Sequence, residues 1–218
     1  MPELPDVEAI RRYLVAVGLP GRTITAVRLD WPRAVQEPSP QEFARRIRGQ
    51  RIQGIGRRAK FLLFALTSTP PKEGSGNLGP PTGVSGRVPL NFQSPSPLRE
   101  RGTQGVRVYL ILHLRMTGSL LVQPASQEPP RHTRTAFALD DGRELRFADP
   151  RKLGMMWLVE DPGPVLSGLG PEPLEPGFTP QVLWERLNGR RAPVKALLCD
   201  QSVVAGIGNI YADEVLFE

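Results

Sequence analysis

The middle of this 218-residue sequence is a succession of short strand-like segments, and this pattern restricts the fold more than any other feature. Turn signals separate the segments, and Asp141-Gly142 is the strongest of them because this dipeptide favours two-residue hairpins. Several short strands separated in this way predict a sandwich or barrel. The predicted strands span residues 23–29, 51–55, 60–66, 106–112, 119–123, 135–139, 144–147 and 155–159.

A helix is predicted over residues 5–17, because Val7, Ile10, Leu14 and Val17 fall on one face and Gly18 is a plausible stop. This helix would tie the N-terminus to a packed element.

Further helices flank the strands. Ser39 to Glu42 reads as a capping box with proline at the first helical position, followed by Phe43 and Ile47 on the buried side. Near the C-terminus, Thr179-Pro180 is a helix start signal. Helices are expected to begin there and to cover 193–199 and 210–217, with a tight turn at 206–209.

Two stretches rich in Pro and Gly interrupt this order. Residues 69–105 have almost no apolar periodicity, so we expect a disordered insertion between two paired strands, a functional lid being the less favoured alternative. Residues 162–178 are interpreted as a linker between two domains.

The charge balance favours a polyanionic partner. Lys and Arg outnumber Asp and Glu by 28 to 22, which points first to nucleic acid and second to an anionic membrane, although a merely soluble basic protein has the same balance. No apolar run reaches the ~20 residues that span a bilayer, and no signal peptide is recognisable, so a cytoplasmic location is expected. One cysteine and two histidines allow no disulfide framework and no zinc cluster.

The first residues, Met1-Pro2-Glu3, carry the main chemical hypothesis. If Met1 is removed, Pro2 presents an amine that titrates near ~7.7 and can act as a nucleophile in Schiff-base chemistry. The carboxyl of Glu3 could transfer protons beside it. On these residues alone the alternative, an ordinary frayed terminus, is favoured.

The order of several segments resembles the formamidopyrimidine-DNA glycosylase and endonuclease VIII superfamily, and within it the bacterial formamidopyrimidine-DNA glycosylases. Any one segment alone is a weak signal, but together they cover most of the chain outside the insertion. The segments are MPELPDVE at 1–8, RRAKFLLF at 57–64, HLRMTGSL at 113–120, FADPRKLGMMW at 147–157, LGPEPL at 169–174 and DQSVVAGIGNIYADEVLFE at 200–218.

The resemblance implies an α+β fold. Residues 1–161 would form a catalytic β-sandwich domain with flanking helices, and 179–218 part of a helix–two-turn–helix domain. Duplex DNA with damaged bases or abasic sites would lie between the two, bound by a monomer.

The resemblance also implies a base-excision repair glycosylase with AP-lyase activity on oxidised purines, 8-oxoguanine and formamidopyrimidines. Pro2 would attack C1′ and expel the base, and eliminations from the resulting imine would nick the strand. Glu3 would handle protons at the sugar, and Lys60 would contact the phosphate. Without the resemblance, Lys60 is better explained as a snorkelling strand residue.

Three residues match the side chains that fill the emptied base stack in this family. Met116 corresponds to the wedge methionine, Arg151 to the base-contacting arginine, and Leu153 stands where phenylalanine is common. An apolar wedge beside an arginine suits kinked DNA. The alternative for Met116 is a core filler. Arg115 replaces a glycine often found before the wedge.

Other residues match DNA-backbone contacts of the family. His132 corresponds to a phosphate-contacting histidine, and a nearby second histidine is Arg134 here. The remaining matches lie in the helical part, where the turn at 206–209 could bind phosphate through free backbone N–H groups. They are Arg191, Lys195 and Asn209.

Most bacterial members continue into a zinc finger with four cysteines, which this sequence lacks, so no metal or other cofactor is expected. By the family pattern Glu218 falls in mid-helix, which suggests a truncated sequence. Two alternative functions follow: a catalytically weak DNA-damage-binding remnant of the family, and a generic basic nucleic-acid-binding protein.

Overall fold

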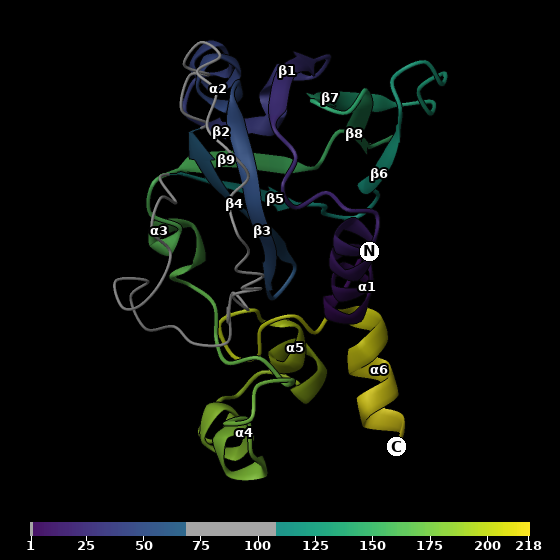
Figure 1. The fold of residues 1–218 in the computed structure, drawn as a ribbon. Helices are drawn as coiled ribbons and strands as arrows, with labels where there is room; N and C mark the ends of the chain where they lie inside the picture. Colours follow the sequence, from purple (N-terminus) through teal and green to yellow (C-terminus); the bar gives the residue numbers. More distant parts are fainter. Residues whose placement is uncertain (1, 69–107) are drawn as a thin grey trace, which may run out of the picture.

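A computed structural model of the protein describes residues 2–68 and 108–218. Two β-sheets pack against each other, and helices lie at their ends and beyond them (Figure 1). One sheet has the order β1 (Ile24–Leu29), β7 (Thr133–Leu139), β8 (Arg143–Ala148), β6 (Ser119–Pro124). The other has the order β2 (Val35–Glu37), β9 (Met155–Val159), β5 (Val108–His113), β4 (Phe61–Ser68), β3 (Gln50–Arg58), with β2 and β9 its one parallel pair among the described strands.

The core lies between the two sheets. Phe64 and Leu110 from one sheet meet Phe137 and Phe147 from the other, and all four are almost fully buried. A second cluster covers the outer face of the five-stranded sheet, where Ile111 and its neighbours pack against the short helix α3 (Gly163–Leu166). Because β4 and β5 are buried on both faces, their sequences are continuous apolar runs and do not alternate.

Two helices close the sandwich. Helix α1 (Leu4–Ala16) buries Leu4, Val7 and Leu14, which lie at helical spacing on one face. Helix α2 (Pro40–Ile47) begins where the Ser39 hydroxyl accepts a hydrogen bond from the Glu42 amide at 3.3 Å. The Glu42 carboxylate pairs with Arg45, so only the Ser39 half of the predicted capping box forms.

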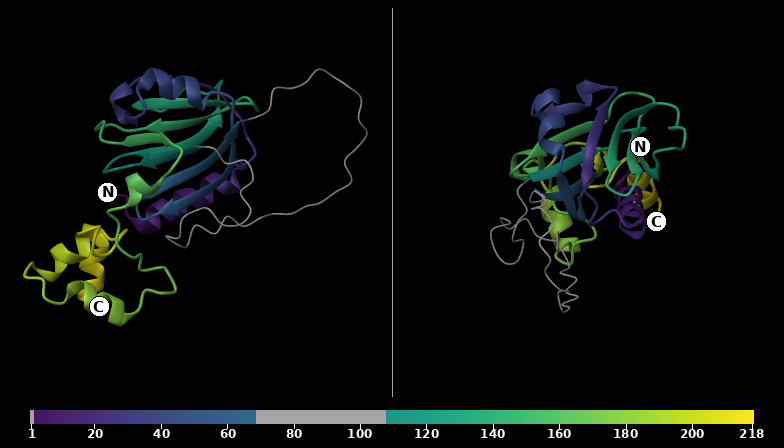
Figure 2. Two further views of the ribbon diagram at one scale, coloured as in Figure 1. Left: turned by 90° about the vertical axis from the view of Figure 1, so that its left-hand side faces the viewer. Right: turned by 45° about the horizontal axis from the view of Figure 1, so that its top comes forward.

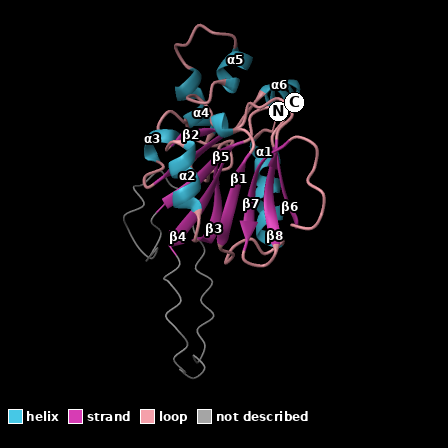
Figure 3. Ribbon diagram, turned by 90° about the horizontal axis from the view of Figure 1, so that it is seen from above, coloured by secondary structure: helices cyan, strands magenta, loops and turns pink. Residues whose placement is uncertain are grey.

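Three more helices follow α3 in the described chain: α4 (Pro180–Leu187), α5 (Val194–Cys199) and α6 (Asn209–Phe217). They gather beyond one end of the strands (Figures 2 and 3). The Thr179 hydroxyl caps α4, as its sequence predicts, by accepting from the Val182 amide. A small apolar cluster that includes Leu198, Val203 and Ala212 holds these helices together.

The predicted fold class, α+β with a β-sandwich and a C-terminal helical part, is confirmed. The structure adds β2 and a 3₁₀ turn at Pro32–Ala34, which are too short to leave a periodic signal in the sequence. Helix α3 and the buried side chain of Glu172 lie inside the stretch predicted as a linker. The insertion predicted at 69–105 lies outside the described residues, and within the described part no helix is long and apolar enough to cross a membrane.

Candidate active site and DNA-binding surface

The carboxylate of Glu3 lies at the N-terminus of α6. It accepts hydrogen bonds from the amides of Gly208 at 2.7 Å, Ile210 at 2.9 Å and Tyr211 at 3.2 Å, and the side chain is 1% exposed. A helix N-terminus favours a negative group, because its first N–H groups have no partner within the helix. The structure therefore fixes the residue next to Pro2 against the far end of the chain.

Two further contacts hold the N-terminal segment in place. The Leu4 amide donates to the Gly206 carbonyl at 3.0 Å, and the Glu3 amide donates to the Asp6 carboxylate at 2.8 Å. Glycine is needed in the facing turn, since Gly206 has φ +102° and a Cβ on Gly208 would stand 2.5 Å from the Glu3 carboxyl carbon. Pro2, directly before these anchors, is half-buried.

Lys60 approaches the same place from the turn between β3 and β4. The side chain is 5% exposed, and burial lowers the pKa of Lys60 below its usual range, while nearby Glu3 and Cys199 partly offset that effect. The turn has only two residues, and Ala59 adopts φ +51° at its first position, where glycine is usual. Lys60 thus lies close enough for the charge of Glu3, the residue after Pro2, to act on it, and both side chains are buried.

A carboxylate from the predicted linker holds this turn in place. Glu172 is 4% exposed and accepts a hydrogen bond from the Ala59 amide. It also pairs with Arg57 at 2.7 Å and Arg58 at 3.0 Å. Sequence reasoning did not single out Glu172, because its partners lie more than a hundred positions earlier in the chain.

His113 is a second residue that sequence reasoning missed. It ends β5, pairs in the sheet with Phe61 next to Lys60, and its ring meets the Phe61 ring edge-on at 4.5 Å between centroids. Burial, together with the positive charges of Arg115 and Lys60, lowers the pKa of His113 to about 4. The available signal was its position in HLRMTGSL, three residues before the predicted wedge methionine.

The three predicted wedge residues come together at this end of the sheet. Met116 is 46% exposed in the loop after β5, and Leu153 is 38% exposed in the loop before β9. The Arg151 guanidinium lies 3.3 Å from the Met116 sulfur. Met116 is thus on the surface and not in the core. Arg115 adopts φ +55°, a conformation that favours the glycine it replaces.

His132 lies beside these loops. Its carbonyl accepts from the Asp149 amide at 3.0 Å, and its ring nitrogen is 3.2 Å from the Arg134 guanidinium. Arg134 also donates to the Asp149 carbonyl at 2.9 Å. A permanent cation thus stands next to His132, at the position where the resemblance led us to expect a second histidine.

The three residues of the helical part that were predicted to contact the DNA backbone are less closely grouped than the wedge residues. Asn209 is exposed and opens α6, Lys195 pairs with Asp213 at 2.7 Å, and Arg191 is exposed in the loop between α4 and α5. The turn at 206–209 was predicted to offer free backbone N–H groups at the start of α6. This is corrected, because the amides of Gly208, Ile210 and Tyr211 donate to Glu3. A carboxylate of the chain itself occupies the position that an anion would take.

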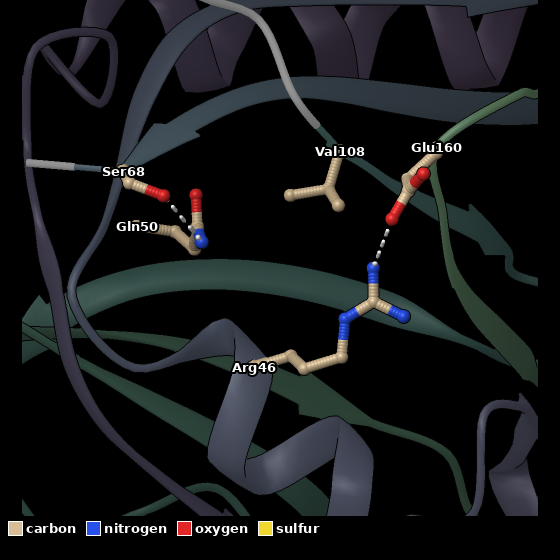
Figure 4. A pocket seen from close by; sticks show the side chains of 5 residues that line it. All are labelled: Arg46, Gln50, Ser68, Val108 and Glu160. Carbon is tan, nitrogen blue, oxygen red and sulfur yellow. Dashed lines mark hydrogen bonds and ion pairs between the residues drawn. The ribbon is translucent and has the colours of Figure 1, made fainter.

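A separate pocket lies at the opposite ends of β3 and β4 (Figure 4). Arg46, Gln50, Ser68, Val108 and Glu160 line it, and Arg46 pairs with Glu160 at 3.2 Å. The nine-residue β3 separates Gln50 from the turn that carries Lys60 by roughly 25 Å, so this pocket is not part of the site described above.

The described residues offer no group of three or more His, Cys, Asp or Glu side chains arranged to hold a metal ion. The single cysteine of the sequence cannot supply the four thiolates of the family's zinc finger.

Comparison with known proteins gives the same picture along the whole chain. Residues 1–156 match the model of the formamidopyrimidine-DNA glycosylase N-terminal domain, and residues 169–218 match that of the formamidopyrimidine-DNA glycosylase H2TH domain. A formamidopyrimidine-DNA glycosylase of Chloroflexus aurantiacus is 44% identical, covering 100% of this chain and 65% of that protein. The chain therefore spans about two thirds of the length of this relative.

Solved structures of similar fold contain DNA. A complex of the Lactococcus lactis Fpg with DNA containing an abasic site has a TM-score of 0.75 at 28% identity, covering 98% of this chain and 65% of that chain. A complex of MutM with DNA containing carbocyclic 8-oxo-G has a TM-score of 0.75 at 28% identity, covering 99% and 67%.

Proposed function

Because the chain belongs to the formamidopyrimidine-DNA glycosylase family, we propose that it is a glycosylase and AP lyase acting on oxidised purines and abasic sites in duplex DNA. The observation that carries the proposal is the position of Glu3. Three backbone amides near the C-terminus fix it next to Pro2, with the buried amine of Lys60 close by. A nucleophile, a carboxyl and a cation are thereby collected at one place, as covalent catalysis at a sugar requires.

In the proposed reaction the amine of Pro2, freed by removal of Met1, attacks C1′ of the damaged nucleotide. The glycosidic bond breaks, the base leaves with a proton, and the Pro2 nitrogen forms an iminium with the opened sugar. The iminium acidifies the C2′ hydrogen, so loss of that proton expels the 3′ phosphate and nicks the strand. Glu3 transfers protons at the sugar, and Lys60 neutralises a phosphate.

The damaged base must leave the helix first, and the wedge residues serve that step. Extrusion costs a few kcal/mol, and side chains that occupy the vacated stack offset part of this cost. Met116, Arg151 and Leu153 are exposed at the same end of the sheet and have suitable chemistry for the task. His132, Arg191, Lys195 and Asn209 would contact the DNA backbone, and the net charge of +6 favours that contact.

Borohydride trapping tests the proposal. The protein is incubated with duplexes carrying 8-oxoguanine or an abasic site, and borohydride then reduces any iminium to a stable covalent adduct. We expect an adduct with both duplexes, stronger for the abasic site, and its loss in Pro2→Gly. Binding to an abasic duplex without any adduct would overturn the enzymatic proposal and favour a damage-binding remnant.

A further inference from the structure

Asp149 is a buried carboxylate that has no part in the proposed reaction. It follows β8 directly and is 1% exposed. Its Oδ1 accepts hydrogen bonds from the Thr117 hydroxyl and the Arg151 amide, and its Oδ2 accepts from the Leu153 amide at 2.7 Å and the Gly154 amide at 2.8 Å. Four donors thus meet on one side chain, which is close to the full capacity of a carboxylate.

These donors belong to two different loops. Thr117 lies in the loop that carries Met116, and the three backbone amides lie in the loop that carries Arg151 and Leu153. One carboxylate therefore joins the two loops whose exposed side chains form the wedge. Among the described side chains, the other hydrogen bond between these loops is the exposed contact from Arg151 to the Met116 sulfur.

The packing beneath the loops is equally tight. The ring of Phe147 lies under both, so that a Cβ added to Gly118 would come within 2.8 Å of it and a Cβ on Gly154 would come closer still. The backbone next to Thr117 and Leu153 therefore packs closely against the Phe147 ring, and Asp149 accepts hydrogen bonds from both loops.

The hydrogen bonds to Asp149 favour its charged form. Burial raises the pKa of Asp149, but the hydrogen bonds from Thr117 and the three amides outweigh burial and leave the pKa below its usual range. At neutral pH the side chain is therefore an acceptor for all four donors and competes with none of them.

We propose that Asp149 is the positioning residue that couples, through Thr117, the two loops of the wedge, so that Met116, Arg151 and Leu153 enter DNA as one rigid unit. The inference rests on the proposed function, because it presumes that these side chains enter DNA. A purely local role, stabilising the end of β8, would predict loss of stability without a specific loss of DNA bending.

Two substitutions at one position separate these roles. Thr117→Val removes the hydroxyl that joins the loops but keeps the shape of the side chain, whereas Thr117→Ser keeps the hydroxyl. Thr135→Val is a matched control, because the Thr135 hydroxyl is fully buried on β7 and has no hydrogen-bond partner among the described residues. Asp149→Asn is a second test. The NH2 group of asparagine would face at least one of the four donors and could not accept its hydrogen bond.

The readout is DNA bending, measured by energy transfer between dyes at the two ends of a duplex that carries a tetrahydrofuran abasic analogue. Wedge insertion kinks a duplex by tens of degrees. At saturating protein we expect Thr117→Val and Asp149→Asn to reduce the ratio of bent to straight bound DNA by roughly tenfold, as expected for a lost buried charge-assisted hydrogen bond. Thr117→Ser and Thr135→Val should bend the duplex like the wild type.

A single-stranded abasic oligonucleotide offers no stack to enter, so borohydride trapping on it should be unchanged in Thr117→Val. Equal losses in bending, trapping and melting temperature would overturn the proposal in favour of a local role. So would a wild-type chain that binds the duplex without bending it. A wild type that bends the duplex but gives no adduct would overturn the proposed chemistry and leave the role of Asp149 standing.

Discussion

The Gly208 amide donates a hydrogen bond of 2.7 Å to the Glu3 carboxylate across 205 positions of sequence. This contact joins the segment that carries the candidate nucleophile to the N-terminus of the last helix. The geometry at Glu3 therefore depends on a residue to which the proposed reaction assigns no chemical role.

Gly208→Ala should displace Glu3, because the new Cβ would stand 2.5 Å from its carboxyl carbon. We expect a melting temperature lowered by several degrees, in line with about 1–3 kcal/mol for overpacking, and a loss of borohydride adduct of at least about tenfold. Gly168→Ala is the matched control, since its Cβ would meet nothing within 4 Å. Equal adduct yields in the two variants would contradict the proposed place of Glu3.

Lys60→Met should weaken binding to an abasic duplex and flatten its dependence on salt. One phosphate contact contributes about one unit to the slope of log K against log salt concentration, so the slope should fall by about that amount. The control is Arg48→Met, which removes an exposed positive charge at the far end of β3. An unchanged slope in Lys60→Met would show that Lys60 contacts no phosphate.

His113 should be neutral at physiological pH, because its pKa lies at about 4 in the folded protein. The unfolded chain binds a proton at the ordinary value of about 6.5, so stability from this residue is present above that pH and is lost as pH falls toward 4. Urea unfolding between pH 7 and 4 should therefore show a steeper loss in the wild type than in His113→Gln. A ring titration near 6.5 by NMR would refute this.

Glu8 should stabilise the fold until strongly acidic pH. Hydrogen bonds from Arg11, followed by those from Arg12 and Arg57, outweigh burial and hold its pKa at about 2, against 4.5 in the unfolded chain. Its contribution is present above pH 4.5 and disappears as pH falls to 2. Because water screens these partly exposed pairs, Glu8→Gln should cost about 1 kcal/mol at pH 7 and much less near pH 2, as measured by denaturant unfolding.

The parts of the fold that could be predicted from the sequence are those that a local residue pattern determines. Period-two segments and the Asp141-Gly142 turn locate most strands, and apolar spacing locates α1 within one residue at each end. The three-residue β2 is too short to show such a pattern, and its strand neighbour among the described residues, β9, lies far along the chain.

In the candidate site, too, local signals could be predicted and long-range contacts could not. Pro2, Glu3 and Lys60 stand out by chemical type and by resemblance, but their anchors do not. In the sequence, Glu172 looks like part of a linker. Its contacts with Arg57 and the Ala59 amide, which hold the β3–β4 turn in place, lie more than a hundred residues earlier. The amides that receive Glu3 also look free in the sequence, because no local signal announces a partner from the opposite end of the chain.

The contact between Glu3 and Gly208 also has a consequence for biosynthesis. A chain growing from the ribosome emerges N-terminus first, so Pro2 and Glu3 leave the tunnel long before the turn that anchors them has been translated. The sandwich can collapse while this segment still lacks its partner, since closure of so long a loop comes late. The candidate nucleophile Pro2 therefore gains this anchored neighbour only when synthesis has passed residue 211, and shorter nascent chains lack the anchor.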